Sequence, residues 1–343
     1  MIAVPGLVDM HVHFREPGQT YKEDIATGGQ AAARGGFTTV CCMANTLPAI
    51  DSRELVELVA SKAAAIELLV VGALSKGLNG KELADFAGMK QGGICALSDD
   101  GKTLMDRDLM KQAALQAKEL GLFITDHCEP ETEIVARDIE LARETGCHFH
   151  LQHISLKESL ELIKTAKAEG INITCETAPH YFTLTSEALK SQGANAKMNP
   201  PLKSEADRLA VIEAIQDGTI DVIATDHAPH SQEEKAQGVE SAPFGVIGLE
   251  TAFALSYTKL VMPGLISLQK LIELMSINPA KILNLHRDEG DFAIFDIGTA
   301  YKINSKEFAS KSRNTPFEGM EVYGRTVMTV SKGRLIYNDR SFN

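Results

Sequence analysis

The sequence of 343 residues has no tryptophan and no excess of basic residues, since 34 Lys and Arg stand against 46 Asp and Glu. The resulting net charge of −12 argues against nucleic acid or an anionic membrane as a partner. No apolar run approaches the roughly 18 residues that a spanning helix needs. The N-terminus also lacks the basic and apolar regions of a signal peptide. These absences predict a cytoplasmic globular protein that binds neither nucleic acid nor membrane.

Paired cysteine motifs and nucleotide-binding loops are missing as well. The six cysteines have no C-x-x-C spacing and fall mostly in or beside predicted strands, which favours reduced, buried thiols: Cys41, Cys42, Cys95, Cys128, Cys147 and Cys175. No Gly-x-Gly-x-x-Gly or P-loop follows a first strand, which counts against an open nucleotide-binding sheet. Gly28 and Gly29 are interpreted as packing positions within a helix.

What the chain does contain is a regular alternation of short apolar runs and amphipathic segments. Eight strands are predicted at 3–10, 38–43, 67–74, 93–98, 122–127, 148–153, 172–176 and 221–225. Helices are predicted between them at 22–33, 52–65, 81–90, 106–120, 131–144, 156–169 and 204–217. Alternating βα units imply a parallel sheet, and eight of them favour a closed (β/α)₈ (TIM) barrel.

After the eighth predicted strand the chain no longer alternates between single strands and single helices. Helical patterns at 249–259, 267–276 and 278–285 are followed by β patterns at 292–296, 322–323, 326–331 and 334–337. We therefore expect a barrel domain over 1–290 and a small C-terminal β segment over 291–343, a truncated β domain packed on the barrel.

Polar, metal-ligating residue types stand where the predicted strands end. Alternate side chains of a strand point the same way, so His11 and His13 can converge on one metal ion. Asp100, His127, His153 and Asp226 follow at the ends of later strands. Active sites of (β/α)₈ barrels lie at the carboxyl ends of the strands.

Four imidazoles and two carboxylates are too many for one tetrahedral zinc ion. They suit two metals with a bridging carboxylate, most simply two Zn²⁺, although Mn²⁺, Co²⁺ or Fe²⁺ accept the same ligands. Such a pair lowers the pKa of bound water to near neutrality and polarises a carbonyl. Asp226 can hold a metal and also pass a proton to a leaving nitrogen. The implied chemistry is hydrolysis of an amide-type bond or its reverse.

Several of these residues have a simpler reading. Asp99 and Asp100 can form a turn before Gly101, and strand alternation lets at most one of the two face the barrel axis. His148 and His150 share parity with each other but not with His153, so we expect them to face the helices rather than a metal. His180 is expected to pack near the site, and His286 has no evident partner.

A second group of residues indicates anion recognition. Arg15 lies two residues beyond His13, where a guanidinium can bind a carboxylate in bidentate fashion, unless it pairs with Glu16. Asn45 and Asn199 are candidate amide partners, although loop asparagines often only shape turns.

The motifs together resemble the amidohydrolase superfamily and, within it, the bacterial dihydroorotases with an aspartate metal bridge. The resembling stretches are PGLVDMHVHFREPG (5–18), MANT (43–46), SDDG (98–101), HCE (127–129), CHFHLQHIS (147–155), ETAPH (176–180), KMNPPL (197–202), ATDHAPH (224–230) and SRNTPF (312–317).

The resemblance implies reversible closure of N-carbamoyl-L-aspartate to L-dihydroorotate in pyrimidine synthesis. It makes His11, His13 and Asp226 ligands of the buried metal, Asp100 the bridge, and His127 and His153 ligands of the second metal. Asp226 would also be the general acid and base. The same resemblance implies that Arg15, Asn45 and His230 bind the substrate carboxylate. Asn199 and the backbone around Phe244 and Gly245 would contact the ring.

The chain also departs from the family pattern. The family's N-terminal β segment is short here, so the tail is expected to lack a sheet partner and to leave an edge for an oligomer contact. The stretch between His127 and His153 is short, which is expected to alter the site wall or the second metal. The alternatives are a hydantoinase- or allantoinase-like cyclic amidase, and a non-catalytic subunit that stabilises aspartate transcarbamoylase. A homo-oligomer is expected, with association with aspartate transcarbamoylase as a further possibility.

Overall fold

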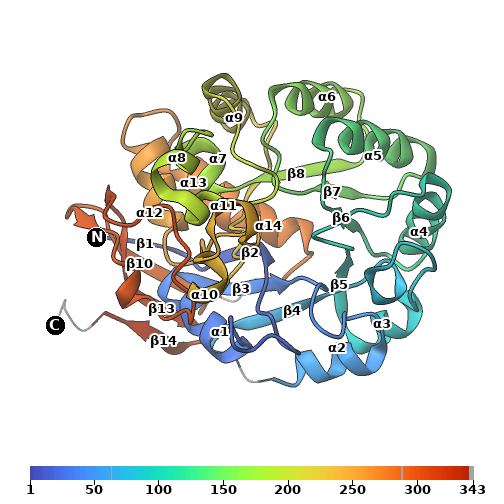
Figure 1. The fold of residues 1–343 in the computed structure, drawn as a ribbon, viewed down its shortest axis with the longest axis horizontal. Coiled ribbons are helices and arrows are strands. Elements are labelled where there is room, and N and C mark those ends of the chain that lie inside the picture. The colour runs from blue at the N-terminus through green and yellow to red at the C-terminus, as the bar shows by residue number, and fades with distance from the viewer. Residues whose placement is uncertain (63, 287–288, 340–343) are drawn as a thin grey trace.

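The computed structural model describes residues 1–343 except 63, 287–288 and 340–343. Its centre is an eight-stranded parallel sheet in which each strand pairs with the next along the chain (Figure 1). The strands are β2 (Leu7–Val12), β3 (Phe37–Cys42), β4 (Glu67–Gly72), β5 (Ile94–Leu97), β6 (Ile124–Asp126), β7 (Phe149–Leu151), β8 (Ile173–Thr177) and β9 (Val222–Ile223). The predicted (β/α)₈ barrel is confirmed.

The barrel is closed by backbone contacts between the first strand, β2, and the segment that follows the last strand, β9. Val12 forms a parallel bridge with His227, and the amide of His13 donates to the His227 carbonyl at 2.9 Å. The buried Asp9 carboxylate accepts from the amides of His11 and Thr225, each at 3.1 Å, which joins β2 to the segment after β9.

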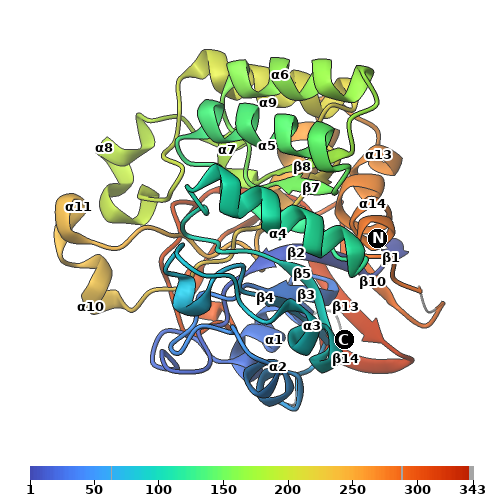
Figure 2. The same cartoon turned by 90° about the vertical axis from the view of Figure 1, so that its right-hand side faces the viewer.

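Seven helices surround the sheet (Figures 1 and 2): α1 (Ile25–Arg34), α2 (Arg53–Ala60), α3 (Phe86–Gly92), α4 (Arg107–Glu119), α5 (Glu131–Thr145), α6 (Lys157–Ala168) and α9 (Glu205–Asp217). The second ends before the predicted residue 65, and residue 63 lies outside the described residues. Among the residues described, no helix combines the length and apolarity needed to cross a bilayer.

Short helices extend the loops at one end of the barrel, where α8, α10 and α11 project from the body (Figure 2). They are η1 (Lys76–Leu78), α7 (Pro179–Thr183), α8 (Ala188–Gln192), η2 (Gly193–Ala196), α10 (Gln232–Lys235) and α11 (Gly238–Ser241). After β9 the helical patterns appear as α12 (Ala252–Ser256), α13 (Leu268–Ile272) and α14 (Asn278–Ile282), with π-helical turns η3 (Tyr257–Val261) and η4 (Glu273–Ile277) between them.

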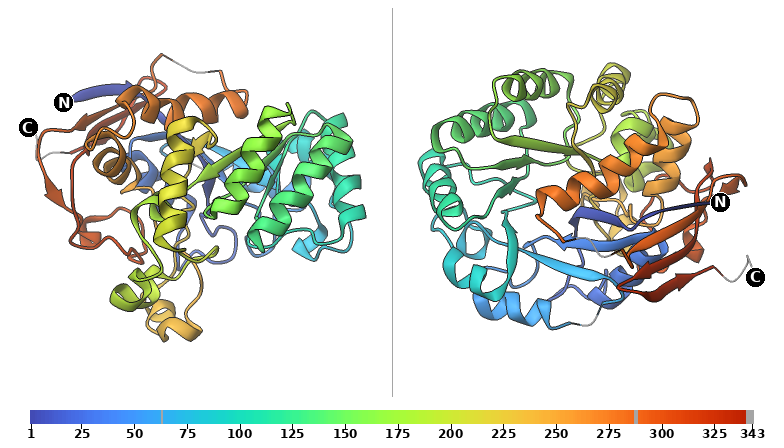
Figure 3. Two further views of the ribbon diagram at one scale, coloured as in Figure 1. Left: turned by 90° about the horizontal axis from the view of Figure 1, so that it is seen from above. Right: turned by 180° about the vertical axis from the view of Figure 1, so that it is seen from behind.

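The C-terminal segment forms an antiparallel sheet that includes the start of the chain. Its order is β1-β10-β13-β14, from β1 (Ile2–Pro5), β10 (Phe292–Asp296), β13 (Arg325–Ser331) and β14 (Arg334–Asn338). A smaller pair joins β11 (Tyr301–Lys302) to β12 (Glu321–Val322), with η5 (Ser305–Glu307) between them. Figure 3 shows β1, in blue, and the C-terminal strands, in red, on the same side of the barrel.

Two expectations for this region were wrong. The strand predicted at 3–10 is divided between two sheets, and the tail has a sheet partner because β1 pairs with β10. The division falls at Gly6, where an added Cβ would lie 2.3 Å from the Thr38 hydroxyl. Only glycine fits this close approach, where the chain passes from one sheet to the other.

Candidate active site

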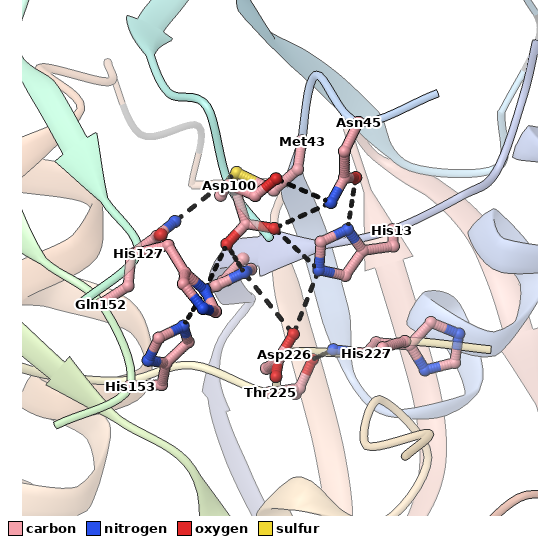
Figure 4. Close-up of polar contacts among 12 residues, drawn as sticks. His13, Met43, Asn45, Asp100, His127, Gln152, His153, Thr225, Asp226 and His227 are labelled. Atoms are coloured by element: carbon pink, nitrogen blue, oxygen red, sulfur yellow. Dashed lines mark hydrogen bonds and ion pairs between the residues drawn. The ribbon is translucent and has the colours of Figure 1, made fainter. Parts of the chain in front are cut away.

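The six candidate ligands meet at the carboxyl ends of the barrel strands, around Asp100 (Figure 4). Asp100 Oδ1 lies 3.2 Å from His11 Nε2 and 3.4 Å from His127 Nδ1, while Oδ2 lies 3.4 Å from His13 Nε2. His153 Nε2 lies 2.8 Å from His127 Nδ1. Asp226 Oδ1 lies 3.1 Å from His13 Nε2 and 3.5 Å from His11 Nε2.

Five of these residues form two overlapping groups whose ligand atoms lie within 4.8 Å of one another, His11–His13–Asp100 and Asp100–His127–His153. Asp100 belongs to both groups, one carboxylate oxygen facing His13 and the other His127. The donors are imidazole nitrogen and carboxylate oxygen, which suit first-row divalent ions. The buried His11 Nε2 makes no hydrogen bond. The residues therefore fit a pair of divalent cations with Asp100 between them.

The electrostatics of the groups agree with this fit. Burial opposes protonation of His11, but the carboxylates of Asp100, Glu176 and Asp226 outweigh it and raise the His11 pKa well above its ordinary value. Burial alone would raise the pKa of Asp100, yet His11 and His13 hold it well below its usual range. Burial, with His127 and His11 nearby, lowers the pKa of His153. The site thus holds ionised carboxylates in a buried place, which positive charge must compensate.

Aspartates 99 and 100 separate as strand alternation requires. Asp99 turns away from the site and accepts from the amides of Leu74 and Ser75 at 2.8 and 2.9 Å, and from the Ser75 hydroxyl. It therefore holds the loop after β4, while Asp100 faces the candidate ligands.

The expectation that His148 and His150 face the helices was wrong. His150 Nε2 lies 3.1 Å from Glu176 Oε2, and Glu176 Oε1 lies 2.6 Å from His11 Nδ1, so His150 points into the barrel. The ring of His148 packs 5.2 Å from that of Phe123, in an apolar cluster drawn from strands around the barrel. The parity argument failed because β7 ends at Leu151 and His153 has φ of +39°. The chain leaves the extended conformation before His153, which lets His150 and His153 both face inward.

A cavity of about 180 Å³ opens beside the carboxylates. Its walls include every residue expected to bind substrate: Arg15, Asn45, Asn199, His230, Phe244 and Gly245. Five of the candidate ligands, all except His11, also line it: His13, Asp100, His127, His153 and Asp226.

Arg15 forms the cationic part of this wall. Its Nε donates to the Pro229 carbonyl at 3.2 Å, and its Nη2 lies 3.4 Å from His230 Nε2. Glu16 instead pairs with Lys62 at 3.1 Å, so the alternative Arg15–Glu16 pair is not present. Burial, together with Arg15, Lys22 and Lys235, lowers the pKa of His230 to about 3. His230 is therefore neutral and the wall takes its positive charge from arginine.

The two asparagines contact candidate ligands. His13 Nδ1 donates to Asn45 Oδ1 at 2.8 Å, and Asn45 Nδ2 donates to Asp100 Oδ2 at 3.0 Å. The Asn199 amide nitrogen lies 3.1 Å from His127 Nε2. His180 is buried without a partner for Nε2, and burial lowers its pKa to about 4.

Asn314, in the C-terminal segment, supports the cavity wall in a way that the sequence analysis missed. The His230 amide donates to Asn314 Oδ1 at 3.1 Å, and Asn314 Nδ2 donates to the carbonyls of Ala228 and Gly245, each at 3.0 Å. Glu176, which contacts His11, was missed too. Glu176 is the first residue of the motif ETAPH, and Asn314 lies in the motif SRNTPF. Glu176 could have been found from the sequence, because it is a charged residue in a predicted buried strand.

The sequence of this chain is similar to those of known amidohydrolases. The model of the amidohydrolase family matches residues 2–336. A dihydroorotase of Brevibacillus brevis is 44% identical over 97% of this chain and 87% of its own length. A dihydroorotase of Desulforapulum autotrophicum is 45% identical over 98% of this chain and 87% of its own.

Solved structures of hydantoinases share the fold. The L-hydantoinase (dihydropyrimidinase) from Arthrobacter aurescens matches with a TM-score of 0.90 at 23% identity, over 98% of this chain and 85% of its own. The dihydropyrimidinase from Brevibacillus agri matches with a TM-score of 0.87 at 21% identity, over the same shares.

Proposed function

Because the chain belongs to the amidohydrolase family and, within it, to the dihydroorotases, we propose that it closes N-carbamoyl-L-aspartate to L-dihydroorotate reversibly, with loss of water. The observation that carries this proposal is the cavity of about 180 Å³ in which Arg15 faces the two candidate metal groups. A cyclic substrate with a carboxylate needs both a hydrolytic centre and a cation in the same cavity.

In this proposal His11, His13, Asp100 and Asp226 hold one cation, and Asp100, His127 and His153 hold the other. We take both to be Zn²⁺, although the donor set also accepts Mn²⁺, Co²⁺ or Fe²⁺. When bound, the metals supply a water activated at neutral pH and polarise the ring carbonyl.

The protein's own residues supply proton transfer and orientation. In hydrolysis, the Asp226 carboxylate takes a proton from the attacking water and gives it to the ring nitrogen as the C–N bond breaks. In ring closure the same carboxylate takes a proton from the carbamoyl nitrogen as the C–N bond forms and gives it to the departing hydroxide, which leaves as water. Its Oδ1 lies among the nitrogens of His11 and His13, which keeps the carboxylate directed into the cavity.

Arg15 binds the substrate carboxylate, with Asn45 and His230 beside it in the cavity wall. Asn199 and the Phe244–Gly245 backbone contact the ring. Gly245 has φ of +136°, and an added Cβ would lie 2.7 Å from that of Ala228, so the backbone itself forms this part of the wall. A neutral hydantoin or dihydrouracil ring offers no carboxylate to Arg15.

The test is hydrolysis of L-dihydroorotate by protein that has been stripped of metal and titrated with Zn²⁺. We expect activity to return and to saturate at one or two Zn²⁺ per chain. Dihydrouracil, hydantoin and allantoin should be turned over more slowly, and faster turnover of any of them would contradict the proposed substrate.

The variant Asp226→Asn distinguishes an enzyme from a scaffold. Loss of the proton carrier should lower kcat by about 10²- to 10⁴-fold. The circular dichroism spectrum should remain that of the wild type. Metal uptake by wild-type protein without turnover would instead support the scaffold that stabilises aspartate transcarbamoylase.

The assembly of the protein is a separate proposal. We propose a barrel domain over 1–290 with a β segment over 291–343, assembled as a homo-oligomer. Light scattering of the purified protein measures its self-association. The same measurement on a mixture with aspartate transcarbamoylase tests whether the two proteins form a complex.

A further inference from the structure

A line of five polar side chains crosses the barrel interior, from the candidate metal site to the amino ends of β7 and β8. His11 Nδ1 lies 2.6 Å from Glu176 Oε1, and Glu176 Oε2 lies 3.1 Å from His150 Nε2. His150 Nδ1 and His148 Nε2 both lie 2.8 Å from the Thr174 hydroxyl. We call these residues, His11, Glu176, His150, Thr174 and His148, the interior network.

The centre of this network is buried, and each buried polar atom there would lower the stability of the fold if it had no hydrogen-bond partner. His11 and His150 are 0% exposed and Glu176 is 1% exposed. A buried carboxylate without partners would be strongly destabilising, and here each oxygen of Glu176 has one imidazole nitrogen. The pairing therefore specifies one arrangement of all three side chains.

One assignment of protons satisfies the contacts of the network to Glu176 and Thr174. An ionised carboxylate only accepts, so His11 Nδ1 and His150 Nε2 both donate to Glu176. His150 Nδ1 then accepts from the Thr174 hydroxyl, whose oxygen accepts from His148 Nε2. With a cation bound, His11 Nε2 would present a lone pair to it, and that atom faces Asp100 and Asp226 at 3.2 and 3.5 Å.

We propose that Glu176, held in place by His150 and Thr174, is the positioning residue that fixes the His11 ring and presents its Nε2 to a divalent cation. This inference rests on the proposed metal site but not on the identity of the substrate. Without the Glu176 acceptor, the His11 ring is free to turn about its Cβ–Cγ bond, and the fraction with Nε2 correctly placed falls.

The test measures Zn²⁺ affinity rather than activity. Metal-stripped wild type and variants compete for Zn²⁺ with a chromophoric chelator, and bound metal is counted by mass spectrometry. Losing a partner that orients a ligand typically costs about 10- to 100-fold in metal affinity. We expect Glu176→Met, which has no acceptor, to fall near the upper end of this range for one site. Glu176→Gln, which keeps one acceptor, should lose less.

Thr174→Val extends the test beyond the residue that touches His11. The valine has a similar shape but no hydroxyl, so His150 loses its second partner and holds Glu176 less firmly. We expect a smaller loss of Zn²⁺ affinity than with Glu176→Met. This variant and Glu176→Gln keep the test informative if Glu176→Met does not fold.

The matched control is Glu250→Met, which replaces a carboxylate that is 2% exposed and hydrogen bonds to the amides of Ala309 and Ser310. Its Zn²⁺ affinity should equal that of the wild type. The proposal is overturned if both Glu176 variants bind Zn²⁺ like the wild type, or if Glu250→Met loses as much. Wild-type protein that binds two Zn²⁺ but leaves dihydroorotate unchanged would contradict the proposed function and leave this inference open to the same measurement.

Discussion

Among single residues, backbone strain is concentrated at the cavity. Six non-glycine residues of the described part of the chain have positive φ, and three of them are Arg15 (+60°), His153 (+39°) and Asp226 (+49°). Such conformations cost about 1–3 kcal/mol and persist where the surroundings enforce them. These three residues lie two or three positions beyond the end of a barrel strand, where the chain turns and directs a side chain over the barrel mouth.

The charge on Arg15 leads to a prediction about substrate choice. Arg15→Gln should raise KM for L-dihydroorotate about 30-fold, since a hydrogen bond to a charged group contributes about 2 kcal/mol. Turnover of neutral dihydrouracil should change little, and steady-state kinetics on both substrates measures the difference. The exposed Arg53→Gln serves as the control. Equal losses on both substrates would mean that Arg15 shapes the wall without binding the carboxylate.

The residues that meet in the cavity could be predicted from the sequence where the spacing of neighbouring residues along a strand fixes the direction of their side chains. His11 and His13 converge because a strand alternates, and Asp99 and Asp100, which follow β5, point in different directions as expected. His150 was misplaced because the left-handed turn at His153 cannot be read from the pattern. Asn314 lies 84 residues from its partner His230, and no local rule of spacing connects positions so far apart.

Among the elements, α1 shows how a helix is fitted to the barrel beneath it. The helix begins with a capping box at Asp24 and buries its alanine face. Gly28 faces the Phe14 ring, and an added Cβ would lie 2.4 Å from it. At Gly29 the nearest atom would be the Ala65 amide nitrogen at 3.2 Å. There is therefore no room for a Cβ atom at Gly28, whereas a Cβ atom at Gly29 needs only a small shift of its neighbour.

Alanine substitution of these glycines tests the difference. Gly28→Ala should destabilise the fold by about 1–3 kcal/mol, because the rigid ring of Phe14 must move. Gly29→Ala should be close to neutral, since a gain in helix propensity of up to about 1 kcal/mol offsets the tighter contact. Urea unfolding of both variants gives the comparison. Similar losses of stability in the two variants would contradict the assignment of the Gly28 effect to packing on Phe14.

Element positions were more predictable than element pairings. Each barrel strand lies within or overlaps its predicted range, because βα alternation sets their order. The union of β1 with β10 joins positions about 290 residues apart, which no periodicity indicates. The helical patterns after β9 were found, but the π-helical turns η3 and η4 within them were not.

At the scale of the whole molecule, Glu250 joins the barrel to the C-terminal segment. Its carboxylate accepts from the amides of Ala309 and Ser310 and pairs with Arg34 at 3.1 Å. Burial raises the pKa of Glu250 to about 7, despite the opposing effect of these partners. The folded state therefore binds this proton more tightly than the unfolded state, whose pKa lies near 4.5.

The sign of the pH dependence follows from this shift. The stabilising contribution is complete below pH 4.5 and is lost as the pH rises to about 7, by up to about 3 kcal/mol. Glu250→Gln removes this titration, so the stability of the wild type relative to the variant should fall between pH 5 and 8. Urea unfolding at several pH values measures it. Exposed Glu158→Gln controls for the loss of one charge, and parallel curves for wild type and Glu250→Gln would contradict the assignment.

Asn314 has a consequence for synthesis of the protein. A chain that has left the ribosome only as far as residue 230 already contains all six candidate metal ligands, but not the side chain that holds Ala228, His230 and Gly245 in place. The six candidate ligands therefore precede in the sequence the side chain that completes the substrate wall. Changes in the segment around residue 314 are expected to disturb that wall before they disturb the candidate ligands.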